Sequence, residues 1–94
     1  MVLKFEPWGN DPVFDWDNEN EAELWGHGIR DFEVEECFDN AHTVVPHRKS
    51  KSESEKYGDR YEILGHTDGG RKLFIIVQHL VANWVRPITA WDDD

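Results

Sequence analysis

The apolar and polar positions along the chain predict an irregular start, a short strand and then two helices. Residues 1–12 contain two prolines and a glycine, which favour an irregular arm held in place by Phe5 and Trp8. Residues 13–16 alternate apolar and polar side chains in part, as a short strand does. Asp17 is a suitable N-cap for the first helix, which we expect to end at the glycines in positions 26 and 28.

The second predicted helix begins near Asp31 and ends near residues 39–40. Its apolar residues are spaced i, i+3 and i+4, which places them on a single face of a helix. This apolar stripe consists of Val34, Cys37 and Phe38. We therefore expect this face of the helix to pack against a sheet.

Four more strands are predicted in the second half of the chain. Residues 43–45 are a β-branched run that Pro46 stops. Residues 60–66 alternate, so that Tyr61, Ile63 and Gly65 lie on one face and Arg60, Glu62, Leu64 and His66 on the other. The sequence TDGG at positions 67–70 is a strong turn signal.

The last two strands differ in character. The continuous apolar run 73–77 is typical of a central strand that is covered on both faces. Pro87 interrupts the strand predicted at 84–91, which indicates a sheet edge or a bulge at that point.

The predicted order is β-α-α-β-β-β-β, and its hairpin connections favour an α+β fold with two N-terminal helices packed on one antiparallel sheet. The length predicts a single domain, 1–94. Within this domain, residues 1–12 form the irregular N-terminal arm and 92–94 an acidic tail. The polar segment 47–58 (HRKSKSESEKYG) is expected to be a mobile loop, either a plain solvated loop or a basic flap over RNA.

Composition excludes several classes of protein. Hydrophobic residues make up 38% of the chain and aromatic residues 13%, too much for an intrinsically disordered protein. No apolar run approaches the roughly 20 residues of a membrane-spanning helix, so no membrane partner is expected. Residues 1–12 lack the features of a signal peptide, and the single cysteine, Cys37, fits a reducing compartment, so we expect a cytoplasmic protein. Cys37 itself is expected to be a small buried side chain.

The net charge of −10 is unevenly distributed. Residues 1–42 hold twelve acids and two bases, whereas residues 43–91 hold five acids and eight bases. Overall acidity argues against a general nucleic-acid binder, because phosphate contacts need Lys and Arg. The mildly basic second half leaves a phosphate-binding face open. A solvated acidic helix surface is the other explanation of this charge pattern.

The sequence favours a site without a metal or cofactor. None of the five histidines has the close spacing of zinc ligands. Cleavage of a phosphodiester without metal needs a base for the ribose 2′-hydroxyl, an acid for the leaving oxygen and a cation for the phosphorane. We expect Glu62 or His79 to act as the base, and Arg60 and Arg86 to bind the phosphate. Arginine and glutamate on one strand face are also typical of cross-strand ion pairs.

Several segments of the chain resemble the BrnT family. In chain order they are VFDWD at 13–17, HGI at 27–29 with Phe32, FD at 38–39, ILG at 63–65, GR at 70–71 with Leu73, and RPITA at 86–90. These segments span residues 13–91, and their order and spacing together are similar to those of the family.

The resemblance implies a RelE-like fold and a toxin of a type II toxin–antitoxin system. Such a toxin is a metal-independent RNA endonuclease that a protein antitoxin neutralises. On this interpretation the catalytic residues are Arg60, Glu62, His79 and Arg86, and further RNA contacts come from Arg71, Lys72 and His66. We expect Arg60, Arg71 and Arg86 to converge on one exposed patch.

The chain also departs from the family at three places. Gly26 stands where the family usually has lysine, Trp91 where it usually has arginine, and the acidic tail where a basic helix commonly follows. Fewer cations weaken phosphate binding. The alternative is therefore a catalytically weak or inactive protein-binding module on the same fold, since five tryptophans fit either an interface or a core. A third possibility is a small-ligand-binding or unrelated α+β domain, which an apolar pocket with few arginines would favour.

Overall fold

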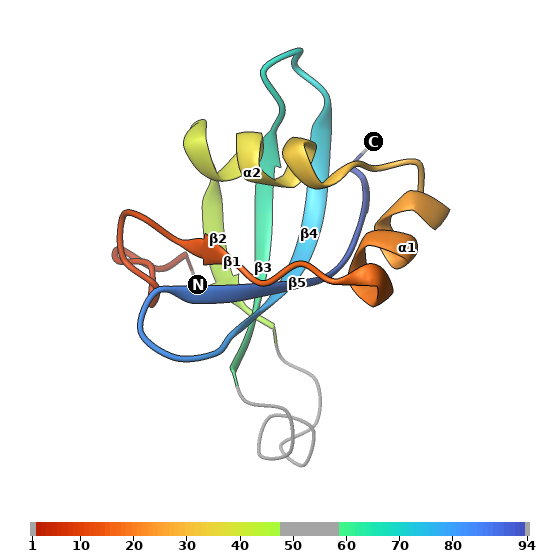
Figure 1. The fold of residues 1–94 in the computed structure, drawn as a ribbon. Coiled ribbons are helices and arrows are strands. Elements are labelled where there is room, and N and C mark those ends of the chain that lie inside the picture. The colour runs from red at the N-terminus through yellow and green to blue at the C-terminus, as the bar shows by residue number, and fades with distance from the viewer. Residues whose placement is uncertain (1, 48–58, 94) are drawn as a thin grey trace.

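The computed structural model describes residues 2–47 and 59–93. The order of its elements confirms the predicted order (Figure 1). The elements are β1 (Val13–Phe14), α1 (Asn18–Gly26), α2 (Asp31–Asp39), β2 (Thr43–Pro46), β3 (Asp59–His66), β4 (Lys72–His79) and β5 (Trp84–Asp92). The predicted mobile loop lies outside the described residues, with the exception of His47.

The five strands form one sheet in the order β1-β5-β4-β3-β2. The pairs β2–β3, β3–β4 and β4–β5 are antiparallel, as expected for strands joined by short connections. The expectation of an entirely antiparallel sheet is wrong, because β1 pairs with β5 in parallel, with Val13 opposite Trp84. Hairpin reasoning applies only to consecutive strands, and the chain passes through both helices and three strands between β1 and β5 (Figure 1). The sheet is therefore mixed.

Pro87 lies at a bulge, as one of the two predicted alternatives requires. The register between β4 and β5 shifts between Ile76 and Val77, where Thr89 and Pro87 are the respective partners. Ile88 is the extra residue on β5. A bulge bends its strand, and β5 is the strand that packs against α1.

Helix α1 begins at Asp17, which forms the predicted cap. The Asp17 carboxylate accepts hydrogen bonds from the backbone N–H groups of Glu19 and Asn20. The side-chain oxygen of Asn20 accepts a hydrogen bond from the backbone N–H of Asp17, and its NH₂ group donates to the carbonyl oxygens of Asp15 and Pro87. The start of α1 is thereby tied to β5. Gly28, with a φ of 73°, ends the helical segment in a conformation that favours glycine.

The core lies between the sheet and α2. The predicted stripe of Val34, Cys37 and Phe38 is buried, which confirms the amphipathic reading of this helix. Burial raises the pKa of the Cys37 thiol to about 11, so the thiol stays protonated at neutral pH. Gly65 on β3 lets α2 come close, because a β-carbon there would lie 3.2 Å from the β-carbon of Cys37.

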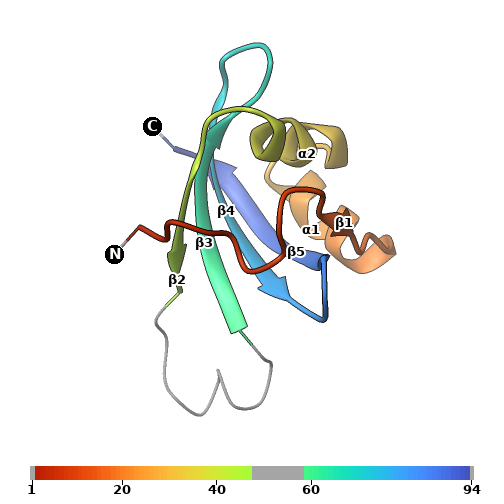
Figure 2. The same ribbon diagram turned by 90° about the vertical axis from the view of Figure 1, so that its left-hand side faces the viewer.

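The N-terminal arm covers the part of the sheet that the helices leave open on the same side (Figure 2). Trp8 is 2% exposed and its ring contacts those of Phe38 and Tyr61. The prediction for Phe5 is wrong, since this side chain is 85% exposed. The arm is held at that point by the backbone of Leu3, which donates to the carbonyl of Val44.

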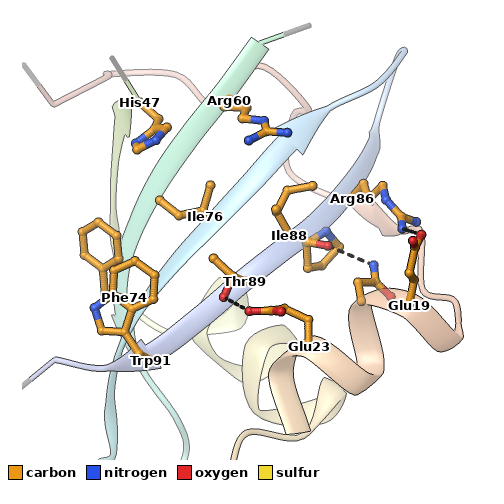
Figure 3. A pocket seen from close by; sticks show the side chains of 12 residues that line it. Glu19, Glu23, His47, Arg60, Phe74, Ile76, Arg86, Ile88, Thr89 and Trp91 are labelled. Atoms are coloured by element: carbon orange, nitrogen blue, oxygen red, sulfur yellow. Dashed lines mark hydrogen bonds and ion pairs between the residues drawn. The ribbon is translucent and has the colours of Figure 1, made fainter. Parts of the chain in front are cut away.

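Strand β4 occupies the centre of the sheet, as predicted, but its two faces differ. Leu73, Ile75 and Val77 are fully buried toward the helices. Phe74 and Ile76 point to the opposite face, where they line a cavity (Figure 3). Both helices lie on one side of the sheet (Figure 2), so the expected cover on both faces of β4 is incomplete. Within the described ranges, neither helix is long or apolar enough to cross a lipid bilayer.

Candidate functional site

A cavity of about 600 Å³ lies on the open face of the sheet, between β3, β4, β5 and the start of α1. Its floor is apolar and aromatic, and polar side chains lie around its edges, with His47 and Arg60 at one end (Figure 3). The apolar lining residues are Phe74, Ile76, Pro87, Ile88 and Trp91; the polar ones are Glu19, Asn20, Glu23, His47, Arg60, Arg86 and Thr89.

His47 and Glu62 form a close pair at one end of this cavity. The Nδ1 atom of His47 lies 2.6 Å from a carboxylate oxygen of Glu62, and both side chains are largely buried. The backbone N–H of His47 donates to the carbonyl of Arg60, which continues the pairing of β2 with β3. This contact orients the imidazole ring of His47 through its Nδ1 atom.

His47 was not among the predicted site residues, because the sequence placed it in the polar loop. Alternation along residues 43–47 was the signal that could have found it. Val45 is the register partner of Glu62, and the next residue on the same face is His47. Reading the strand past Pro46 would have placed His47 beside Glu62.

Arg60 and Arg86 lie on the same face of the sheet and line the same cavity, as predicted (Figure 3). Both are register partners of Gln78 on β4, one from each side. Two strand spacings separate their backbones, which is about 10 Å. A single anionic group in the cavity is thus within range of two long guanidinium side chains.

The charge of Arg86 is compensated by three carboxylates. The guanidinium lies 3.3 Å from Asp15, 2.8 Å from Asp17 and 3.7 Å from Glu19. The hydrogen bond to Asp17 is the main cause that raises the pKa of Arg86, and the same bond lowers the pKa of Asp17. These carboxylates weaken the attraction of Arg86 for a phosphate. Figure 3 shows Arg86 turned toward Glu19.

Arg71 lies apart from this cavity, so the expected convergence of three arginines is wrong. Its Nε and Nη2 atoms donate to Asp92, at 2.6 and 3.0 Å, and its Nη1 atom donates to Glu33 and to the carbonyl of Gly28. The bonds to Asp92, and to a lesser extent those to Glu33, raise the pKa of Arg71. The residue precedes β4 at the end of the sheet near the start of α2, where it ties α2 to the end of β5.

The remaining predicted residues are distributed over both faces. His66 and Lys72 are register partners and line a second, smaller cavity of about 390 Å³ beside Asp93. His79 lies on the other face, the one that carries the helices. Its ring is 6.1 Å from that of Trp8, and its Nε2 atom is hydrogen-bonded to the carbonyl of Ala82. Strand alternation thus separates His79 from Arg60, and Glu62 is the predicted base that adjoins the cavity.

In the part of the chain that the structure describes, no three His, Cys, Asp or Glu side chains are grouped so that they could hold a metal ion. No protein-family model matches this chain, and no curated protein matches it.

Proposed function

We propose that this protein is a BrnT-like toxin with a RelE-like fold, an RNA endonuclease that works without a metal and is neutralised by a protein antitoxin. The observation that carries the proposal is the shared cavity. Arg60, Arg86 and His47 line one cavity on the open face of the sheet, and Glu62 is bonded to His47. Phosphodiester cleavage by the ribose 2′-hydroxyl requires a base, an acid for the leaving oxygen and a cation, and the residues around this cavity can supply the base and the cation.

His47 has the geometry of the general base. Its Nε2 atom takes the proton of the 2′-hydroxyl, while Glu62 holds the ring through Nδ1 and stabilises the imidazolium that forms. The 2′-oxygen then bonds to the adjacent phosphorus and the bond to the 5′-oxygen breaks. Solvent water supplies the proton to the leaving oxygen. Arg60 stabilises the charge that develops on the phosphorane, since a guanidinium binds two phosphate oxygens at once.

The test is RNA cleavage by the purified protein in the presence of EDTA. We expect the wild type to cleave single-stranded RNA, and we expect the His47→Ala and Arg60→Ala variants each to be slower by a factor of about 100 or more. Arg30→Ala is the matched control, because Arg30 is an exposed arginine whose guanidinium lies over the ring of Trp25 and outside the cavity. A wild type without activity, or an Arg60→Ala variant as fast as the wild type, would overturn the proposal.

A second candidate is a protein-binding module with weak or no catalysis. It is favoured by the three carboxylates around Arg86 and by two aromatic side chains on the helices, Trp25 and Phe32, which are 61% and 54% exposed. Exposed aromatic residues of this size are typical of interface hot spots. The test is co-expression with the product of the neighbouring reading frame. The module is supported if the two proteins co-purify and a Trp25→Ala/Phe32→Ala variant does not, while the wild type leaves RNA intact.

A further inference from the structure

Phe74 and Trp91 form a stacked aromatic pair at the end of the cavity opposite His47 and Arg60 (Figure 3). The two residues are direct partners across β4 and β5. Their ring centroids are 4.7 Å apart and the planes are tilted by 23°. Trp91 is nonetheless 41% exposed, so one indole remains accessible while its neighbour holds it in place. An aromatic ring that is both fixed and accessible is a stacking surface for another planar ring.

We propose that the Phe74–Trp91 pair is the stacking site, called the nucleobase seat below, for one unpaired nucleobase of single-stranded RNA. This inference rests on the ribonuclease function proposed above. Along β4, Phe74 is four residues from Gln78, the partner of Arg60. The backbone of Phe74 is therefore about 13 Å along the strand from the position that pairs with Arg60. A ligand that reaches both needs a planar ring at one end and an anion at the other. A nucleotide chain has this form, with the base on the aromatic pair and a neighbouring phosphate at Arg60 and His47.

The charges around the cavity favour a single strand over a duplex. Glu19 and Glu23 of α1 form the rim beside the apolar floor, and the Glu19 side chain is 91% exposed. These acidic side chains repel phosphates, so among the lining residues the end with Arg60 suits an RNA backbone better. A duplex would carry a second backbone over the same face. A base must also leave its own stack to lie on the pair, which unpaired nucleotides do at least cost.

The test measures binding of an eight-nucleotide single-stranded RNA and its cleavage by four proteins: the wild type, Trp91→Leu, Trp91→Phe and Trp84→Leu. Leucine keeps apolar contact with Phe74 and removes the stacking surface, so we expect Trp91→Leu to bind the RNA about tenfold more weakly or worse. Trp91→Phe should stay close to the wild type. Trp84 is the control, because it is 43% exposed on the same strand but lies outside the cavity. Circular dichroism verifies the fold of each variant.

The outcomes separate this inference from the proposed function. If the wild type cleaves RNA and folded Trp91→Leu binds it equally well, the nucleobase seat is overturned and the ribonuclease proposal stands. If the wild type binds but does not cleave, and only Trp91→Leu loses affinity, the seat is supported and the ribonuclease proposal fails. Equal binding of a duplex of the same length would overturn the preference for single strands. Loss of a protein partner by Trp91→Leu with unchanged RNA binding would also overturn the seat.

Discussion

The Nδ1 atom of His47 lies 2.6 Å from the Glu62 carboxylate, and the backbone of His47 pairs with that of Arg60. Of these two side chains, His47 lines the cavity, whereas the Glu62 carboxylate lies behind it and contacts the imidazole. In the proposed mechanism Glu62 is therefore a positioning residue, whereas His47 is the group that exchanges a proton with the substrate.

This arrangement predicts that the effects of His47 and Glu62 on RNA cleavage are not additive. Glu62→Gln should lower kcat with little change in KM, because the amide holds the ring less well and does not stabilise the imidazolium. The double variant His47→Ala/Glu62→Gln should be no slower than His47→Ala alone, since Glu62 acts only through the histidine. The measurement is a double-mutant cycle on cleavage rates. Rates that multiply independently would show that Glu62 acts on the RNA by another route.

The N-terminal arm provides a prediction about stability. Trp8 is 2% exposed and packs against Phe38 and Tyr61, so Trp8→Ala should lower the free energy of unfolding by about 3–5 kcal/mol. Phe5→Ala should change it by less than about 0.5 kcal/mol, because the Phe5 side chain is 85% exposed. Urea denaturation of the two variants checks the difference. A large decrease in the free energy of unfolding of the Phe5→Ala variant would mean that the Phe5 ring packs against the protein in solution.

The features that the sequence predicted well are those in which local pattern and burial agree. The stripe of Val34, Cys37 and Phe38 has helical spacing and lies in the core, and the proline at position 87 sits at a bulge. The faces of β3 follow from simple alternation, so Arg60 was placed correctly with respect to the sheet. These inferences need only residues that are close together in the chain.

The features that the sequence did not predict depend on contacts between distant segments. The parallel pairing of β1 with β5 joins residues about seventy positions apart. The carboxylates that bind Arg86 come from the segment that leads into α1 and from its first turn, and those that bind Arg71 come from α2 and β5. The prediction for His79 fails for a similar reason, because its place on the helix-side face depends on the register of β4 against β3. Alternation within one strand does not reveal which charges meet across the fold.

Gly65 provides a prediction about how closely α2 approaches β3. A β-carbon at this position would lie 3.1 Å from the β-carbon of His42 and 3.2 Å from that of Cys37. Neither atom is the end of a flexible side chain, so Gly65→Ala should destabilise the protein by about 1–3 kcal/mol. Gly69→Ala is the control, since only the Thr67 hydroxyl lies near its β-carbon, at 3.9 Å. The measurement is the urea midpoint at constant m-value. Equal midpoints for the two variants would contradict the close approach.

The last prediction concerns acid stability and the pair of Arg71 with Asp92. The hydrogen bond from Arg71 is the main cause that lowers the pKa of Asp92 below its ordinary value of 3.8. A carboxyl group whose pKa is depressed by folding contributes stability above its unfolded pKa and loses that contribution as the pH falls through the folded value. The wild type should therefore have a higher urea midpoint than Arg71→Gln at pH 7, and the difference should shrink steadily below about pH 4.

Lys72→Gln is the control for this experiment, because it removes the same charge from the neighbouring position. Its midpoint should stay close to that of the wild type at every pH, since loss of one exposed charge changes stability little. If the difference between the wild type and Arg71→Gln were as large at pH 2.5 as at pH 7, the stabilisation would come from a contact that does not titrate. The bond from Arg71 to the carbonyl of Gly28 is such a contact. The pH dependence thus distinguishes an arginine that ties the fold together through its carboxylates from one that acts through the backbone.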